Sequence, residues 1–185
     1  MNKIIEIRLH GRGGQGTVTA AELIAMSAFN DGKEVQAFPN FGVERRGAPV
    51  MAYARISDEK IKTREQISKP NFLIVQDASL IKTDPAVLQG VSKDVAVLVN
   101  TESTDWPEIR SKNVYFVPAT AIALEIIGKP YINTALLGAF AAVSGIISQE
   151  SVEKAIREKF VSKPELIEKN VEAMKRAYKN LLSKV

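Results

Sequence analysis

The chain has 185 residues, of which 45% are hydrophobic and 25% are charged, as in an ordinary water-soluble globular protein. It contains no cysteine, which excludes disulfides, thiolate nucleophiles, iron–sulfur ligation and cysteine-based zinc sites, and its single histidine, His10, argues against a histidine-based metal site. The net charge of +4 comes from 25 basic and 21 acidic residues that alternate along the chain. This pattern argues against nucleic-acid binding and favours a mildly basic surface that meets acidic partners or phosphates.

No segment of the sequence resembles a targeting signal or a membrane span. The apolar run near the N-terminus is too short and too interrupted for a signal peptide. The longest apolar stretch, residues 131–147, is rich in small residues and is better explained as a buried helix. We therefore expect a cytoplasmic protein with a single domain over residues 1–185, in which residues 150–185 form a C-terminal helical extension.

Strand and helix patterns alternate along the chain. The predicted strands occupy residues 4–9, 35–38, 49–56, 72–75, 95–99 and 114–117. The predicted helices occupy residues 17–29, a short segment that opens at Asp84-Pro85, and residues 119–127, 132–147, 150–160 and 164 onward. Residues 57–60 resemble a hairpin turn into Ile61, which would make the sheet mixed. These elements predict an α/β protein, a three-layer α/β/α arrangement with a mixed sheet, a Rossmann-like first strand–glycine loop–helix unit and C-terminal helices.

The last predicted helix carries one apolar stripe that needs a surface to cover it. The chain's own core is the favoured surface, and another subunit is the alternative. The stripe consists of Leu166, Ile167, Val171, Met174, Tyr178, Leu181 and Leu182.

A glycine-rich loop lies between the first strand and the first helix. It consists of Gly11, Arg12, Gly13, Gly14, Gln15 and Gly16. Glycine permits a sharp turn and a close approach of a ligand or another backbone segment. The free backbone amides at the start of the following helix favour an anion, and Arg12 would add a forked contact to a phosphate. The loop therefore predicts a site for a phosphate or pyrophosphate.

The glycine loop has two alternative roles. A dinucleotide-binding fold needs an acidic residue at the end of the second strand, and here that strand ends in Pro39-Asn40 while Glu34 precedes it. NAD or FAD binding is therefore disfavoured. The glycines would also be needed if they only allowed a close strand–helix crossing or a close contact with another subunit.

A second motif follows the second strand, at residues 40–49. Loops at the carboxyl ends of strands form the ligand crevice in open α/β folds, so this loop is expected to lie beside the glycine loop. Arg45 and Arg46 would then face the same anion or a carboxylate of a partner, and Glu44 would pair with one of them. The alternative is an exposed charged loop without a ligand.

Three further polar residues lie close to these motifs. His10 precedes the glycine loop, where a structural hydrogen bond is favoured over acid–base catalysis. Asp77 follows a buried strand and is expected to cap the next turn rather than face the crevice. Asn133 is interpreted as a helix cap, with an interface contact as the alternative.

Three segments together resemble a known family over nearly the whole chain. They read RLHGRGGQGTVTAAELIA, FPNFGVERRGAPVMAYARIS and NTALLGAFAAVSGII. They are similar to the gamma subunit of the pyruvate and 2-oxoisovalerate ferredoxin oxidoreductases. Within them, the sequence ERRGAPV resembles the pyruvate or branched-chain branch of the family. In some members the same unit is one domain of a longer chain.

This resemblance implies a subunit without catalytic residues of its own in an enzyme that converts pyruvate and coenzyme A to acetyl-CoA and CO2 while reducing ferredoxin, or runs in reverse. It implies that thiamine diphosphate, Mg and iron–sulfur clusters belong to partner subunits, namely thiamine-binding and ferredoxin-like chains. Gly11–Gly16, Arg45 and Arg46 would lie on the coenzyme A side of the active centre. The alternatives are a subunit of the branched-chain 2-oxoisovalerate enzyme and a free-standing nucleotide-binding regulatory module.

Overall fold

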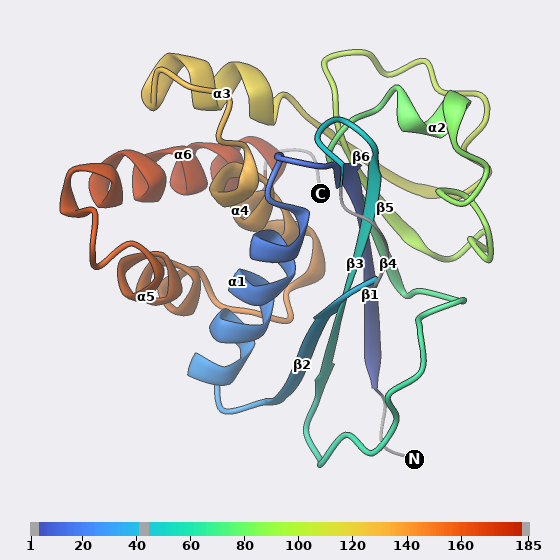
Figure 1. Cartoon of the computed structure of the whole chain (residues 1–185), viewed down its shortest axis with the longest axis horizontal. Coiled ribbons are helices and arrows are strands. Elements are labelled where there is room, and N and C mark those ends of the chain that lie inside the picture. The colour runs from blue at the N-terminus through green and yellow to red at the C-terminus, as the bar shows by residue number, and fades with distance from the viewer. Residues whose placement is uncertain (1–3, 41–44, 183–185) are drawn as a thin grey trace.

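Six strands form one sheet through the middle of the computed structural model, which describes residues 4–40 and 45–182 (Figure 1). The strands are β1 (Ile5–Arg12), β2 (Glu34–Pro39), β3 (Pro49–Ser57), β4 (Phe72–Val75), β5 (Ala96–Asn100) and β6 (Asn113–Val117). Their order across the sheet is β2-β3-β1-β4-β5-β6. Strands β1, β4, β5 and β6 pair in parallel, whereas β3 is antiparallel to both β1 and β2. The predicted α/β fold with a mixed sheet is confirmed.

The helices cover the two faces of the sheet unequally. They are α1 (Thr17–Asn30), α2 (Leu80–Thr83), α3 (Ala119–Ile126), α4 (Asn133–Ser144), α5 (Gln149–Lys159) and α6 (Pro164–Leu182). Helices α1, α3, α4, α5 and α6 lie on one side of the sheet, and the short α2 lies with long loops on the other (Figure 1). No helix in the described part of the chain is long and apolar enough to cross a membrane.

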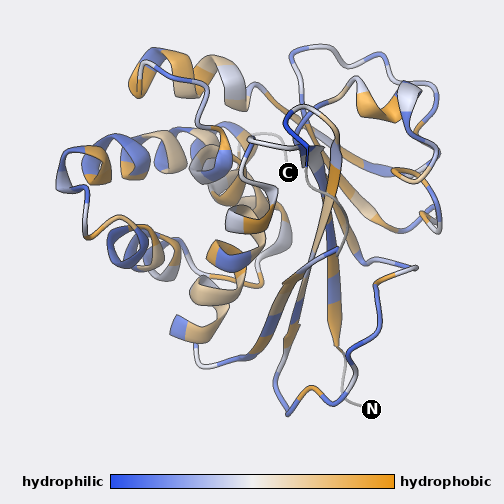
Figure 2. Ribbon diagram, in the orientation of Figure 1, coloured by the Kyte–Doolittle hydropathy of each residue, from blue (hydrophilic) through white to orange (hydrophobic). Residues whose placement is uncertain are grey.

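Strand β1 separates two different environments because its side chains alternate between the faces of the sheet. Ile7 and Leu9 are fully buried in the core under the five helices. Arg8 and His10, which alternate with them along the strand, are also buried but do not belong to that core. A smaller cluster of valine, leucine and isoleucine lies between the sheet and α2. In Figure 2 the central strands are largely orange, and α5 and α6 carry both orange and blue residues.

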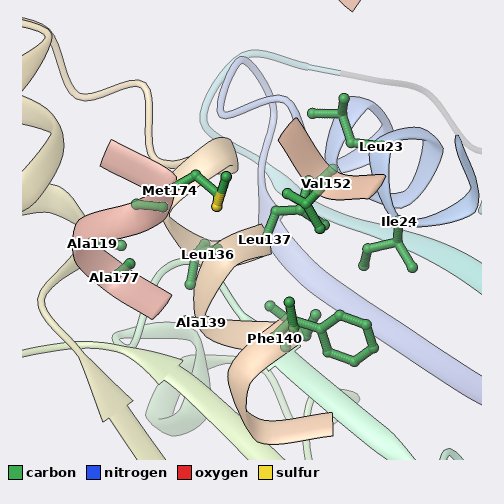
Figure 3. Packing of buried hydrophobic residues seen from close by; sticks show 14 of the residues in the cluster. Leu23, Ile24, Ala119, Leu136, Leu137, Ala139, Phe140, Val152, Met174 and Ala177 are labelled. Carbon is green, nitrogen blue, oxygen red and sulfur yellow. The ribbon is translucent and has the colours of Figure 1, made fainter. Parts of the chain in front are cut away.

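Helix α4 lies at the centre of the larger core. Leu136 is placed near Met174 of α6, while Leu137 lies toward Ile24 of α1 (Figure 3). Helix α6 comes so close that a Cβ atom added to Gly138 would overlap the carbonyl oxygen of Met174. The alanine-rich and glycine-containing sequence of α4 is therefore explained by close helix packing.

The apolar stripe of α6 packs largely against the chain's own core, as favoured from the sequence. Val171, Met174 and Leu181 are buried, and Ile167 and Tyr178 pack partly against the same cluster. Leu182, the last residue of the stripe, is exposed.

Two local predictions are wrong. No strand forms at Ile61, and residues 58–71 run as a loop to β4, so the sheet is mixed because β3 is antiparallel and not because of a hairpin at Ser57. The short helix α2 ends before Asp84-Pro85 instead of starting there. Asp84 is extended because a following proline disfavours the helical conformation.

Asp31 connects the end of α1 to the start of α5. Its carboxylate accepts hydrogen bonds from the Ser148 amide (2.7 Å), the Ser148 hydroxyl (2.7 Å) and the Ser151 hydroxyl (2.5 Å). Burial acts to raise the pKa of Asp31, but these hydrogen bonds outweigh it and hold the pKa below its ordinary value. The ionised carboxylate therefore stabilises the folded chain.

We expect Asp31→Asn to lower the free energy of unfolding at pH 7 by about 2 kcal/mol, in the range for hydrogen bonds to a charged group. Because the folded-state pKa is depressed, this contribution is present above the unfolded pKa of about 3.9 and is lost as pH falls through the folded value. Urea unfolding of both chains at pH 7 measures the loss of stability, and the same measurement below pH 4 shows whether the difference between them shrinks. Asp58→Asn is the control, because this exposed partner of Lys33 should contribute under about 1 kcal/mol. Equal losses in the two variants would contradict the role of Asp31.

Candidate functional site

The glycine loop turns the chain from the end of β1 into the start of α1. Gly16 is the N-cap residue of α1 and adopts a left-handed conformation with φ of 72°. The helix has no side-chain cap and no acidic residue in its first turn. Its first backbone amides lack partners within the helix, so they are available to an acceptor from outside. This is the arrangement that favours an anion at a helix N-terminus.

The double-arginine segment is joined directly to the glycine loop. The Gly13 amide donates to the Ala48 carbonyl (2.8 Å), and the Gly47 amide donates to the Gly13 carbonyl (3.0 Å). A Cβ atom on Gly13 would overlap the carbonyl oxygen of Arg45. The predicted proximity of the two motifs is therefore confirmed, and it is made by the backbone. The Glu44 pairing predicted from the sequence lies outside the described residues.

An open pocket of about 420 Å³ lies at the start of α1. The residues that line it are Arg12, Gly13, Gly14, Gly16, Thr17, Val18, Thr19, Pro39 and Val50. Arg45 and Arg46 are exposed beside this loop and have no side-chain hydrogen bond or ion pair with any described residue. Because their backbones contact Gly13, which lines the pocket, both residues lie beside it.

Arg12, predicted to contact a phosphate, makes three contacts within the chain. Its Nε pairs with the Asp77 carboxylate (2.6 Å), and its terminal nitrogens donate to the Gly47 carbonyl (3.0 Å) and the Ser79 hydroxyl (3.0 Å). The guanidinium therefore clamps β1, the double-arginine segment and the turn after β4 together. Its charge is already matched by Asp77, so it is less available to an anion than Arg45 or Arg46.

Asp77 caps the next turn, as the sequence indicated, and also reaches the site. One carboxylate oxygen accepts from the Ser79 amide (3.0 Å) and hydroxyl (2.6 Å), and the other pairs with Arg12. Burial acts to raise the pKa of Asp77, but the hydrogen bonds from Ser79 and Arg12 lower it below its ordinary value. Sequence reasoning missed this pair, although both residues end neighbouring parallel strands.

Gln76 brings the third motif segment to the glycine loop. Its side chain is buried, accepts a hydrogen bond from the Thr17 hydroxyl (2.7 Å) and donates to the Asn133 side-chain oxygen (3.0 Å). Asn133 makes no side-chain cap at α4, so its predicted capping role is wrong. A Cβ atom on Gly16 would overlap the Asn133 amide nitrogen, which explains the need for glycine there.

The Gln15 side chain faces inward, where its oxygen accepts from the Arg12 amide (2.7 Å). Gln15 therefore holds the shape of the turn. His10 is buried, and its Nε2 has no partner in the described structure. Burial and then the Arg8 charge lower the pKa of His10 to about 3, so the ring is neutral at pH 7. The sequence predicted a structural hydrogen bond for His10, and its Nε2 makes none with the described residues.

We expect Gly13→Ala to detach the double-arginine segment from the glycine loop. The added Cβ would overlap a backbone oxygen, which has no flexible side chain to move aside. Hydrogen–deuterium exchange should then become at least about tenfold faster at the Gly47 amide, because opening this pair exposes its hydrogen bond to Gly13. Gly32→Ala is the control, since a Cβ there meets nothing within 4 Å. Unchanged exchange at Gly47 in Gly13→Ala would contradict the backbone junction.

The chain is similar to known proteins over nearly its whole length. The family model described as pyruvate ferredoxin/flavodoxin oxidoreductase matches residues 6–180. Pyruvate synthase subunit PorC of Methanocaldococcus jannaschii is 54% identical over 181 residues, which cover 98% of this chain and 99% of that protein. The common gamma subunit of the pyruvate/ketoisovalerate oxidoreductases of Pyrococcus abyssi is 48% identical over 180 residues, covering 95% and 96% of the two chains.

A solved structure gives the same result in three dimensions. The crystal structure of pyruvate oxidoreductase subunit PORC from Thermotoga maritima is 39% identical, covers 96% of both chains and superposes with a TM-score of 0.81. The family model spans both motifs and the C-terminal helices, and the match confirms the resemblance identified from the three sequence segments. The chain belongs to the pyruvate ferredoxin/flavodoxin oxidoreductase family, as a subunit of the gamma or PorC type.

Proposed function

We propose that this chain is the gamma subunit of a pyruvate:ferredoxin oxidoreductase and that its glycine loop, with Arg45 and Arg46, forms part of the coenzyme A side of the active centre. The enzyme converts pyruvate and coenzyme A to acetyl-CoA and CO2 and reduces ferredoxin, or runs in reverse. The observation that carries the proposal is the backbone junction between Gly13 and Gly47-Ala48. It places the exposed Arg45 and Arg46, which have no side-chain partner among the described residues, beside the uncapped start of α1.

Coenzyme A fits this arrangement by its charge. Its pyrophosphate and 3′-phosphate are anionic, and backbone amides at a helix start favour such groups. Arginine adds a planar fork of donors that suits phosphate oxygens. The role of these residues is to bind and orient the coenzyme, whose thiol accepts the acyl group. The chain itself supplies no catalytic residue in this proposal.

The electron-transferring groups belong to other subunits. A chain without cysteine has no thiolate to ligate an iron–sulfur cluster. Thiamine diphosphate with Mg and the clusters are therefore assigned to thiamine-binding and ferredoxin-like partner chains, and ferredoxin is reached through the complex. The cytoplasm is the compartment in which we expect this assembly.

Reconstitution tests the proposal. Partner subunits alone should show little pyruvate- and coenzyme A-dependent ferredoxin reduction, and adding this chain should restore it. The isolated chain should reduce no acceptor with pyruvate. Full activity of the partner subunits without this chain, or pyruvate-dependent reduction by the chain alone, would contradict the proposal.

A second substrate assignment is supported by one comparison. The Pyrococcus abyssi relative is named as a subunit common to pyruvate and ketoisovalerate oxidoreductases. This chain would serve two enzymes if its partners occur in two sets. Purifying it from native cells and assaying each complex with pyruvate and 2-oxoisovalerate distinguishes one assembly from two.

A further inference from the structure

Arg8 of β1 is buried without a carboxylate partner among the described residues. The residue is 3% exposed. Arginine is almost never buried to this extent unless it is paired. Among residues 4–40 and 45–182, none supplies a carboxylate to Arg8, and its side chain instead donates to backbone carbonyls. Within the described residues, this buried positive charge is therefore held by neutral carbonyl groups.

The two ends of the guanidinium are held differently. One terminal nitrogen, Nη2, donates to the carbonyls of Val87 (3.0 Å) and Gln89 (2.6 Å). The other, Nη1, reaches the carbonyls of Ile67 and Ser68 only at 3.4 Å. The buried Nε has no partner in the described structure. Hydrogen bonds of 3.4 Å lie beyond the usual range, so Nη1 and the unpartnered Nε are the two donors most available to a stronger acceptor.

A cavity of about 220 Å³ adjoins this arginine. Its lining contains no acidic side chain, and its polar members besides Arg8 are Asn40, Tyr53, Gln66, Ser68 and Gln89. Both acceptors of Nη1, Ile67 and Ser68, belong to the lining. Burial raises the pKa of Tyr53 despite the nearby Arg8 charge, so its hydroxyl remains a donor at neutral pH. The cavity shares no lining residue with the pocket at the start of α1.

We propose that this cavity binds a carboxylate group that pairs with Arg8. One buried positive charge is neutralised by one carboxylate, whereas a doubly charged phosphate would leave an excess negative charge in a poorly solvated place. Arginine and carboxylate also match in planar geometry. The carboxylate comes either from a free short-chain acid or from an aspartate or glutamate side chain of a partner subunit. The two sources make the same contact and are separated by experiment.

The first arm tests a free acid on the full-length chain. Sodium acetate and sodium chloride are compared at equal ionic strength by thermal unfolding. At acetate tenfold above its Kd, the midpoint should rise by roughly 3–6 °C for a chain of this size. The ¹⁵N signal of Arg8 Nε should shift in the same titration. Arg8→Met should abolish the effect of acetate, and Arg110→Met, which removes an exposed arginine outside the cavity lining, should retain it.

The second arm tests a partner side chain in the assembled complex. Gln66→Glu places a carboxylate from this chain itself at the cavity. Because it leaves Arg8 in place, this variant can be tested even if Arg8→Met does not fold. If a partner carboxylate enters the cavity, assembly should slow hydrogen exchange in residues 66–68 and 87–89, and Gln66→Glu should weaken assembly at least tenfold. If a free acid is the ligand, Gln66→Glu should abolish the acetate effect without weakening assembly. The proposal is overturned if both arms fail. In the first arm, acetate would leave the unfolding midpoint and the Arg8 signal unchanged. In the second, assembly would not slow exchange in these segments, and Gln66→Glu would not weaken assembly.

Discussion

Replacing both Arg45 and Arg46 by alanine is expected to raise the KM of the assembled enzyme for coenzyme A by about ten- to a hundredfold. A lost hydrogen bond to a charged group contributes about 1.5–3 kcal/mol, and these two exposed side chains have no described partner that would hold them away from a ligand. The KM for pyruvate should change much less, because thiamine diphosphate, the group on which the 2-oxoacid is decarboxylated, is proposed to belong to a partner chain. Steady-state kinetics with each substrate varied in turn measures the difference.

Arg110→Ala is the matched control, since it removes an exposed arginine that does not line the pocket at the start of α1. The double variant Arg45→Lys with Arg46→Lys should bind coenzyme A more tightly than the double alanine variant, but less tightly than the original chain. Lysine supplies the positive charge but lacks the planar, forked donors of arginine. Normal coenzyme A kinetics combined with weakened assembly would contradict the binding role and identify the two arginines as contacts between subunits.

Gly138→Ala is expected to lower the free energy of unfolding of the chain by about 2–3 kcal/mol, as overpacking of a dense core does. Alanine at an unconstrained helix position would instead stabilise by about 1 kcal/mol relative to glycine. At Gly138 alanine should destabilise the fold instead, because the new Cβ meets the carbonyl oxygen of Met174. Helices α4 and α6 would have to move apart to make room for it. For a chain of this size the unfolding midpoint should fall by roughly 4–12 °C, which calorimetry can measure.

Gly145→Ala serves as the comparison at the end of the same helix. A Cβ at Gly145 meets nothing within 4 Å, but its φ of 60° is left-handed. That conformation costs a non-glycine residue about 1–2 kcal/mol. A loss in Gly138→Ala no larger than this would show that α4 and α6 are not in close backbone contact.

The sequence predicted the fold where local patterns and tertiary packing agree. The buried strand at residues 72–75 and the helices around α1, α3, α5 and α6 appear within a few residues of their predicted bounds. The hairpin at Ser57 failed because a turn signal does not reveal whether the following residues find a strand to pair with. The helix at Asp84-Pro85 failed because the restriction that proline imposes on the preceding residue outweighed its preference for a first helical turn.

The site was predicted in outline and not in its internal contacts. Glycine spacing and the position of the double-arginine loop were enough to bring the two motifs together. The partner of Arg12 could not be inferred, because Asp77 is distant in sequence and becomes a neighbour only through parallel pairing of β1 and β4. The Gln76–Asn133 contact similarly depends on where α4 crosses the glycine loop.

The most direct test of the account is a structure of the assembled complex determined with coenzyme A bound. The account predicts that a coenzyme A phosphate lies within hydrogen-bond distance of the first amides of α1 or of the Arg45 or Arg46 guanidinium. A coenzyme A molecule bound away from this chain, with a partner segment covering the start of α1 and both arginines, would contradict it.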